Sequence, residues 1–294
     1  MLENIIKNNP EYLSGEYKKA DSGFTNSIYI FDNQFILKIC TDEKNESNFL
    51  NEINFYKENR DNKYIPHVYK YNNITKPYYI IIEKLDGISL YNIWYKLNNN
   101  ERERIIKDLT ECLKGFHSHK RESQNWENLM IAKALNVTDK VRQYELLDES
   151  ILKTIENIIK SAKEYLISDS ICMIHGDIHF DNIFYTPNRE IKIIDFETSS
   201  YAPVDYELDI LLRMCRNPKK YANEITEDYV ELNDYYMIPI WFQKYYPEIF
   251  QINNLAKRLL FYDLYYNLKL YTKHVNDNEI KETILNIIKK IKED

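Results

Sequence analysis

The sequence predicts an α+β protein with a small β-rich N-terminal part and a larger, mainly helical C-terminal part. Two observations support this prediction. In the first 86 residues, short runs of β-branched and aromatic residues alternate with turns, and a single helical pattern interrupts them. After that point, apolar residues recur mainly at helical spacing. We therefore expect two domains, residues 1–86 and 87–294, with the boundary at Gly87.

The N-terminal part contains candidates for four strands and one helix. Residues 27–31 and 34–39 flank an Asp-Asn turn and are expected to form a β-hairpin. Residues 45–59 carry apolar side chains at helical spacing, whereas residues 68–71 and 78–83 are again rich in β-forming residues. The expected order is therefore strands, one helix and further strands.

Helical patterns dominate the C-terminal part. Apolar residues mark one expected helix at residues 105–116 and another at residues 147–159. Beyond Asp205, four more stretches have helical patterns, namely residues 208–214, 229–236, 255–271 and 280–291.

Length and charge limit the classes of function. With 294 residues, the chain can bury a substantial core in one large domain or in two lobes. Its net charge of -7 argues against a nucleic-acid partner, because phosphate binding depends mainly on Lys and Arg. The same charge mildly favours a cationic substrate.

The cysteines and the apolar runs indicate the compartment. None of the four cysteines forms a Cys-x-x-Cys pair, so we expect small buried thiols in a reducing environment. The N-terminus has no basic start followed by an apolar run, and no apolar run is long enough to span a bilayer. We expect a cytoplasmic monomer without a membrane partner.

The most informative segment lies between residues 174 and 196. It reads Ile-His-Gly-Asp-Ile-His-Phe-Asp-Asn at its start and Ile-Ile-Asp-Phe at its end. Asn182 follows Asp177 by five residues, and a β-rich pair, a turn and a second β-rich run lead from Asn182 to Asp195. A hairpin brings its two ends together, so we expect these three side chains to converge. Asn and Asp also offer the oxygen ligands that Mg²⁺ prefers.

This segment resembles the aminoglycoside phosphotransferase and choline kinase branch of the protein-kinase-like fold, on the strength of His-Gly-Asp, the Asn five residues later and Ile-Asp-Phe. The resemblance is most specific over residues 172–210, weaker in the first 90 residues and almost absent after residue 215. It implies a two-lobed protein-kinase-like fold with a nucleotide-binding N-terminal lobe. The C-terminal lobe would carry the catalytic and acceptor-binding residues.

The resemblance also assigns roles to the three polar residues. Asp177 is implied to be the catalytic residue that accepts or orients the proton of the acceptor hydroxyl. Asn182 and Asp195 are implied to hold Mg²⁺, which bridges the nucleotide phosphates. His175 is expected to hydrogen-bond within the catalytic loop, whereas His179 is expected to be an ordinary loop histidine.

Lys38 is the candidate for the phosphate-pairing lysine. It lies in an apolar strand that resembles the strand carrying this lysine in kinases. A strand lysine is otherwise usually solvated at its tip. Glu52 lies between Leu50 and Ile53 on the following helix and is the preferred ion-pair partner, with Glu46 as the alternative.

The loop expected to cover the phosphates is the weakest motif. Residues 21–27 contain one Gly and do not match Gly-x-Gly-x-x-Gly. The candidates for phosphate contacts are Ser22, Gly23 and Ser27, and a plain surface turn is the alternative.

Residues 81–87 resemble the segment that joins the lobes of a kinase. By that resemblance, Ile82 backs the adenine pocket and the backbones of Glu83 and Leu85 bond the base, although Ile82 fits an ordinary core equally well.

Two further features depart from protein kinases or leave alternatives open. Glu197 replaces the Gly of Asp-Phe-Gly, as the resemblance to small-molecule kinases allows. An acidic residue that braces the catalytic loop is also implied, and the sequence does not choose among Asp205, Glu207 and Asp209.

The implied activity is the transfer of a phosphoryl group from ATP or GTP, with Mg²⁺, to a hydroxyl of a small polar molecule. An aminoglycoside-type antibiotic is the preferred acceptor, which implies a role in antibiotic resistance. Choline, ethanolamine and other small alcohols or amino-sugars are the alternatives. Acidic residues at 224–234 would suit a polyamine sugar, and aromatic residues at 241–266 would suit a quaternary ammonium.

Two other classes of protein are alternatives, and each predicts a different set of residues. Gly-Asp-Ile-His at residues 176–179 resembles the opening of a metallophosphoesterase motif. No Gly follows Gly176 and only His274 follows His179, so the further blocks of that motif are missing. A non-catalytic, kinase-like nucleotide-binding protein would commonly have lost the base, a metal ligand or the strand lysine, and this chain retains all of them.

Overall fold

The structure, a computed structural model, describes residues 1–20, 26–122, 125–222 and 226–293. Contacts divide the chain into two compact units, and each unit combines segments that are distant in sequence. The first unit consists of Met1–Cys112, His175–Ser200 and Pro218–Tyr235. The second consists of Leu113–Ile174, Tyr201–Asn217 and Tyr236–Asp294. The first unit thus contains both the N-terminal β-rich region and the candidate catalytic segment, and the lobe boundary at Gly87 stays a prediction.

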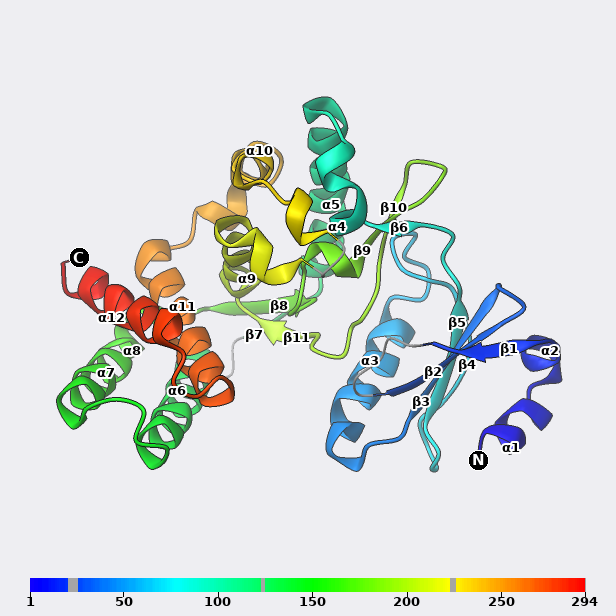
Figure 1. Ribbon diagram of the computed structural model, residues 1–294, viewed down its shortest axis with the longest axis horizontal. Coiled ribbons are helices and arrows are strands. Elements are labelled where there is room, and N and C mark those ends of the chain that lie inside the picture. Colours follow the sequence, from blue (N-terminus) through cyan, green and yellow to red (C-terminus); the bar gives the residue numbers. More distant parts are fainter. Residues whose placement is uncertain (21–25, 123–124, 223–225, 294) are drawn as a thin grey trace. The chain divides into compact units, whose positions relative to one another are not determined.

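The first unit is built on a five-stranded antiparallel sheet (Figure 1). In spatial order its strands are β1 (Tyr17–Lys19), β2 (Asn26–Phe31), β3 (Phe35–Cys40), β5 (Tyr79–Glu83) and β4 (Val68–Asn72). The predicted hairpin is formed by β2 and β3. Its two turn residues have positive φ angles, 46° at Asp32 and 55° at Asn33, a conformation that Asp and Asn tolerate better than most residues.

Side-chain alternation gives the sheet two different faces. Leu37, Ile39 and Ile81 point into a core with two short N-terminal helices, α1 (Leu2–Lys7) and α2 (Pro10–Leu13). Lys38 lies between two of these core residues in β3 and therefore points to the opposite face. Helix α3 (Glu46–Glu58) runs beside the sheet, at the place where the sequence predicts a helix (Figure 1).

The remaining elements of the first unit are short, apart from the start of α5. They comprise a three-stranded sheet of order β10-β9-β6, helices and single 3₁₀ turns. Their bounds are β6 (Ile88–Ser89), α4 (Leu90–Ile93), η2 (Trp94–Lys96), α5 (Asn99–His117), η3 (Phe180–Asn182), β9 (Ile183–Tyr185), β10 (Ile191–Ile193), η4 (Pro218–Tyr221), η5 (Glu227–Tyr229) and η6 (Leu232–Asp234). The prediction of a helix at residues 229–236 is wrong, because the structure has two separate 3₁₀ turns there, η5 and η6. Asn233 and Asp234 lie in the second of these turns, and both residue types favour turns over helix interiors.

The second unit is mainly helical and has one apolar core. Its helices are α6 (Trp126–Gln143), α7 (Glu149–Ser161), α8 (Lys163–Leu166), α9 (Val204–Arg216), α10 (Ile238–Tyr245), α11 (Leu255–Lys273) and α12 (Asn278–Glu293), with the 3₁₀ turn η7 (Pro247–Phe250). A small sheet of order β11-β8-β7 completes it, formed by Ser200–Ala202, Ser170–Ile174 and Lys120–Glu122. Helices predicted around residues 147–159, 208–214, 255–271 and 280–291 are present as α7, α9, α11 and α12.

Helix α9 buries all three acidic residues that compete for the bracing role. Asp205 accepts two hydrogen bonds from Arg258, at 2.6 and 3.0 Å. Asp209 is paired with Arg213, and burial raises the pKa of this carboxyl to about 6. Glu207 lies 3.7 Å from the His117 ring. The candidates therefore differ in their partners although they share one helix.

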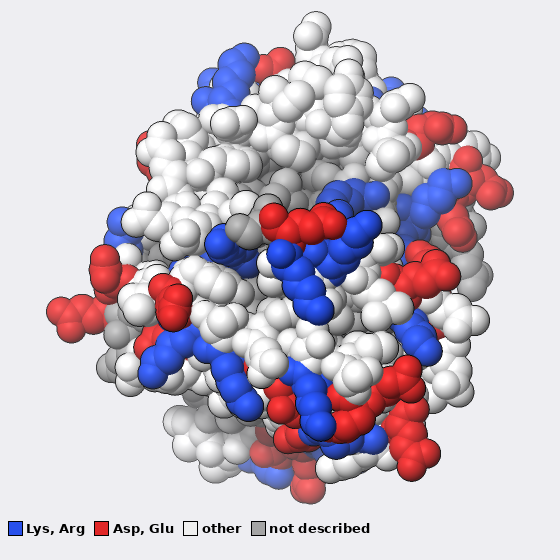
Figure 2. All heavy atoms as spheres, turned by 90° about the vertical axis from the view of Figure 1, so that its left-hand side faces the viewer, with Lys and Arg blue, Asp and Glu red and all other residues white. Residues whose placement is uncertain are grey.

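Three surface features complete the description. Within the part of the chain that is described, no helix combines the length and apolarity needed to cross a membrane. On the face drawn in Figure 2, acidic and basic side chains are interspersed rather than separated into fields of one sign. Three of the four free cysteines are buried as predicted, whereas Cys40, the last residue of β3, is partly exposed.

Candidate nucleotide and metal site

One cavity of about 330 Å³ in the first unit gathers most of the predicted cofactor and metal residues. Six of them line it: Lys38, Glu52, Ile82, Glu83, Leu85 and Asp195. Apolar side chains from β2, β3, β5, β9 and the end of β10 form much of the remaining wall, including Ile28, Ile36 and Phe184. A mainly apolar hollow with a few converging charged groups is the usual character of a small-molecule site.

The buried ion pair between Lys38 and Glu52 forms part of the wall of this cavity. The Lys38 Nζ is 2.8 Å from Glu52 Oε1 and 2.7 Å from Glu52 Oε2. Glu52 is 1% exposed and Lys38 is 9% exposed, so water screens this pair only weakly. The alternative partner, Glu46, pairs with Lys76 instead. The structure therefore contains the ion pair that the sequence favoured.

Two more carboxylates surround the same ammonium group. Oxygen atoms of Glu52, Asp195 and Glu197 all lie within 4.8 Å of one another, and Glu197 Oε1 is 3.8 Å from Lys38 Nζ. When all three carboxylates are ionised, they exceed the single ammonium by two negative charges. Oxygen ligands with this excess charge fit a divalent cation such as Mg²⁺.

Burial and the nearby carboxylates change the pKa values of both Lys38 and Glu52. Burial raises the pKa of Glu52 to about 7; Lys38 opposes the increase, while the Asp195 and Glu197 carboxylates add to it. Burial lowers the pKa of Lys38, but the surrounding carboxylates, with Glu52 the strongest, outweigh it and leave the pKa above its ordinary value. The ammonium therefore stays charged, but its single positive charge cannot neutralise all the carboxylates around it.

The loop around Gly176 is fixed by backbone geometry and by His175. Gly176 has φ +81°, and a Cβ atom added there would lie 2.4 Å from the Thr198 carbonyl oxygen, so the position requires glycine. The Asp177 N–H donates to His175 Nδ1 at 3.2 Å, which leaves Nε2 protonated to donate to the Ile194 carbonyl at 2.9 Å. His175 thus ties the loop to β10, as expected for an architectural histidine.

The predicted hairpin brings the metal candidates together. Strands β9 and β10 pair antiparallel, and the Ile194 N–H donates to the Asn182 carbonyl at 3.0 Å. Asn182 therefore lies opposite the residue that precedes Asp195. Its side-chain Nδ2 donates to the Asp177 carbonyl at 2.9 Å. The amide nitrogen is thus occupied within the loop, and the amide oxygen is the atom that suits a metal.

His179 lies close to two candidate functional residues, Asp177 and Asn182, although the sequence predicts an ordinary loop histidine. Its Nε2 is 3.4 Å from Asp177 Oδ2 and 3.3 Å from Asn182 Nδ2. Burial lowers the pKa of His179, but Asp177, Asp181 and Asp195 outweigh this effect and raise the pKa above its ordinary value. The Asp177 side chain is 45% exposed, so its carboxylate is accessible to a bound molecule.

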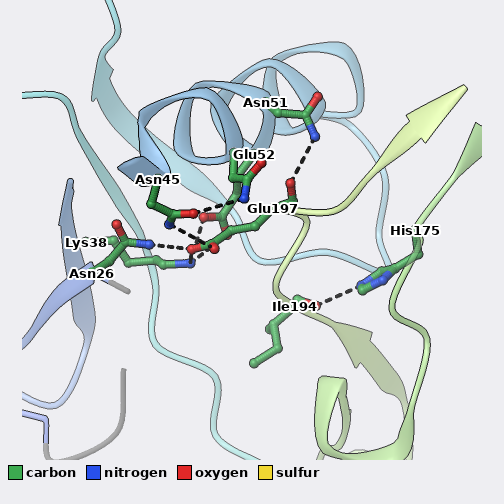
Figure 3. A network of polar contacts seen from close by, with 9 residues as sticks. Asn26, Lys38, Asn45, Asn51, Glu52, His175, Ile194 and Glu197 are labelled. Carbon is green, nitrogen blue, oxygen red and sulfur yellow. Dashed lines mark hydrogen bonds and ion pairs between the residues drawn. The ribbon is translucent and has the colours of Figure 1, made fainter. Parts of the chain in front are cut away.

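A network of asparagine side chains holds the residues after Asp195 (Figure 3). Asn26 of β2 donates to Glu197 Oε1, and Asn45 Nδ2 lies 3.3 Å from Glu197 Oε2. Asn51 of α3 donates to the Glu197 carbonyl at 3.2 Å. No sequence pattern distinguishes these asparagines, because Asn is abundant in this chain and each contact is made across more than 140 residues. Glu197 alone carried a signal, as a departure from Asp-Phe-Gly.

The predicted phosphate loop is only partly described. Ser22 and Gly23 lie outside the described residues. Ser27 belongs to β2 and pairs with Ile39, while its neighbour Ile28 lines the cavity. Alternation along the strand puts the Ser27 side chain on the opposite face, so its position does not support phosphate binding.

The candidate base-binding segment lies at the cavity wall. Ile82 is 5% exposed and faces the hollow from β5. The Glu83 N–H donates to the His67 carbonyl and the Lys84 N–H donates to the Gln34 carbonyl, both at 2.8 Å. These bonds fix the path of the segment. The backbone contacts of Glu83 and Leu85 to a base stay a prediction.

The raised pKa of Glu52 predicts a pH dependence of stability. Between the ordinary carboxyl value of 4.5 and about 7, folded Glu52 binds more protons than unfolded Glu52, so the free energy of unfolding falls as pH rises. The contribution of Lys38 is fully present throughout this interval. Without metal or nucleotide, the urea midpoint of the wild type should fall more between about pH 5 and about pH 8 than that of Glu52→Gln. Glu58→Gln, an exposed position on the same helix, should follow the wild type, and equal slopes for all three proteins would contradict the prediction.

Comparison with known proteins shows the same fold over nearly the whole chain. A structure titled as the gentamicin complex of APH(2")-IIa is 18% identical, with TM-score 0.69, over 98% of this chain and 95% of that one. A GDP and kanamycin complex of APH(2")-IIia is 15% identical, with TM-score 0.67, over 99% and 98% of the two chains. These similarities confirm the predicted protein-kinase-like fold, with a small antiparallel β-sheet part and a larger helical part.

A curated protein kinase gives a shorter match. The serine/threonine-protein kinase ppk21 of Schizosaccharomyces pombe is 30% identical over 91 residues, which are 31% of this chain and 16% of that protein. The chain thus spans a small fraction of the length of this relative.

Family membership follows from the sequence match. Residues 16–235 match the family described as "Phosphotransferase enzyme family". The predicted resemblance to aminoglycoside phosphotransferases and the prediction of a small-molecule kinase are confirmed. The chain belongs to the phosphotransferase enzyme family.

Proposed function

We propose that this protein transfers the terminal phosphoryl group of ATP or GTP, with Mg²⁺, to a hydroxyl of an aminoglycoside-type antibiotic. The observation that carries the proposal is the cavity lined by the buried Lys38–Glu52 pair and by Asp195, with the Glu197 carboxylate close to these three side chains. Phosphoryl transfer needs mainly positioning and charge stabilisation, and this cavity supplies both. We also propose that the protein acts as a cytoplasmic monomer and confers antibiotic resistance.

The nucleotide would lie along the cavity. Its base would contact the Ile82 side chain and the backbones of Glu83 and Leu85, which line the hollow. Its phosphates would meet the Lys38 ammonium, which Glu52 holds in place and keeps charged. Structures of related fold have titles that name bound ATP, ADP or GDP, which supports a nucleotide donor and leaves its base open.

Asn182 and Asp195 would hold the metal, and Glu197 is the additional carboxylate nearby. The amide oxygen of Asn182 suits this role because its nitrogen is bonded to the Asp177 carbonyl. Mg²⁺ bound there would neutralise charge on the transferring phosphoryl group. The excess of two negative charges around Lys38 explains why this corner of the cavity would favour a divalent cation.

Asp177 would act on the acceptor. Its carboxylate is partly exposed and lies next to His179, while its backbone is held by His175 and Asn182. A fixed carboxylate of this kind orients a hydroxyl for in-line attack and accepts its proton. His179 would help to set the direction of the carboxylate.

Two observations favour a cationic, aminoglycoside-type acceptor. Related folds were solved with gentamicin, streptomycin, kanamycin or hygromycin B. In the first unit, Glu227, Asp228 and Glu231 are exposed in the segment that precedes Tyr235. By contrast, the aromatic residues considered for a choline cage include Trp241, Phe242 and Tyr262, and all three are buried in the second unit.

An acceptor screen tests this proposal directly. Purified protein with Mg²⁺ and ATP or GTP should release nucleoside diphosphate faster with gentamicin or kanamycin than with choline, ethanolamine or glucosamine. A coupled assay for ADP and GDP gives the rates. Faster release with choline would favour the choline kinase alternative, and Mg²⁺-independent nucleotide binding without turnover would favour a non-catalytic nucleotide-binding protein.

Removal of the Asp177 carboxylate should separate chemistry from binding. Asp177→Ala and Asp177→Asn should lower kcat by ~100-fold or more, the usual contribution of a positioned base. The dissociation constant of the Mg²⁺–nucleotide complex should stay within about twofold, because the nucleotide cavity is unchanged. Asp169→Asn, an exposed position, serves as the control. Turnover retained in both Asp177 variants would refute the catalytic role.

Neutralising Asp195 should have opposite effects with and without metal. With Mg²⁺, Asp195→Asn should weaken ADP binding by ~10-fold or more, because a metal ligand is weakened. Without Mg²⁺, binding should be unchanged or tighter, since one negative charge near the phosphates is gone. Titration calorimetry in MgCl₂ and in EDTA gives both constants. Equal tightening by Mg²⁺ in wild type and variant would contradict the metal role.

A further inference from the structure

Asp195 has a backbone conformation that needs external support. Its φ angle is +67°, in the left-handed region that residues with a Cβ atom rarely adopt. Such a conformation persists only where neighbouring contacts determine it. The carboxylate that lines the cavity therefore depends on what holds the residues on either side.

On the preceding side, the support comes from the hairpin. The Ile194 N–H is bonded to the Asn182 carbonyl, and the Ile194 carbonyl accepts from His175. The residue before Asp195 is thus fixed by two hydrogen bonds. The following side has no strand partner until β11 begins at Ser200.

On the C-terminal side of Asp195, the support comes from one asparagine of α3. Asn51 Nδ2 lies 2.5 Å from the Ser199 carbonyl oxygen, 3.2 Å from the Glu197 carbonyl oxygen and 3.1 Å from Ser199 Oγ. Figure 3 shows the Asn51 side chain reaching from α3 toward the Glu197 carbonyl. A single amide group therefore bridges two carbonyls that are two residues apart.

Neighbouring residues on the same helix reinforce this contact. Phe55 lies one turn after Asn51 and stacks on Phe196, with ring centroids 3.9 Å apart and an interplanar angle of 9°. Glu52, the residue after Asn51, binds Lys38. Adjacent positions of one helix thus hold both the phosphate-pairing lysine and the segment that carries Asp195.

The chemistry at position 51 is specific. Both carbonyls need a hydrogen-bond donor, so an aspartate there would place an acceptor against acceptors. Alanine would leave the carbonyls without this donor. Glutamine keeps the donor on a side chain that is longer by one methylene group.

We propose that Asn51 is a positioning residue for Asp195: its amide holds the chain at Glu197 and Ser199, so that Asp195 keeps its left-handed backbone and its carboxylate stays directed at the metal. The proposal rests on the proposed function of the site, because it assigns Asn51 an effect on metal-dependent nucleotide binding. Asn51 itself does not line the cavity.

The test compares Asn51 with Asn54, an exposed asparagine on the same helix. Dissociation constants of ADP are measured by titration calorimetry with MgCl₂ and with EDTA, for the full-length wild type and for Asn51→Ala, Asn51→Asp and Asn51→Gln. Asn54→Ala and Asn54→Asp are the matched controls. The quantity of interest is the factor by which Mg²⁺ tightens ADP binding.

In Asn51→Ala and Asn51→Asp, this factor should fall at least fivefold, with ADP affinity in EDTA within twofold of wild type. Asn51→Gln should recover part of the loss, and both Asn54 variants should match wild type. The proposal is overturned if Asn51→Ala keeps the wild-type factor, or if affinity in EDTA falls equally. If Asn51→Ala does not fold, Asn51→Gln and Asn51→Asp decide, and equal factors in these two overturn it. Wild-type binding that ignores Mg²⁺ would instead reject the proposed function.

Discussion

The Lys38 ammonium is surrounded by more negative charge than it can neutralise, and the candidate site is arranged around this imbalance. Glu52 holds the lysine with two short contacts, while Asp195 and Glu197 approach the same group from a distant segment. In a buried, weakly screened cavity, such an excess costs free energy unless protons, a cation or hydrogen-bond donors offset it. The raised pKa of Glu52 and the asparagine side chains around Glu197 are two responses to the same constraint.

Helix α3 connects the parts of this arrangement. It contributes Glu52 to the lysine, Asn51 to the backbone after Asp195 and Phe55 to the Phe196 ring. Because a helix is stiff over such a short distance, these contacts fix one another. Asn51 and Phe55 do not line the cavity, yet both contact the segment that follows Asp195, so the site includes supporting residues as well as the residues that line the cavity.

The sequence predicts the polar centre of this site well because local patterns determine it. Alternation in β3 directs Lys38 away from the core, helical spacing turns Glu52 inward, and the hairpin register brings Asn182 opposite Ile194. Long-range partners leave no such local pattern. Asn26 and Asn51 contact a segment more than 140 residues away, and nothing in their own neighbourhood distinguishes them from other asparagines. The sequence wrongly predicts a helix near residue 229, where turn residues prevail, and it predicts no helix at α6, where the helical pattern of apolar residues is weak.

The composition of the first compact unit has a consequence for dissecting the protein. The five-stranded sheet and α3 share the first unit with His175–Ser200. In the sequence, His175–Ser200 comes only after a stretch that belongs to the other unit. A fragment ending at residue 86 would keep the lysine and its glutamate but lack the β9–β10 hairpin, Phe196 and the Asp195 carboxylate that lines the cavity. The first unit is thus discontinuous in the sequence, and its autonomous folding would require joining its separate segments rather than truncating the chain.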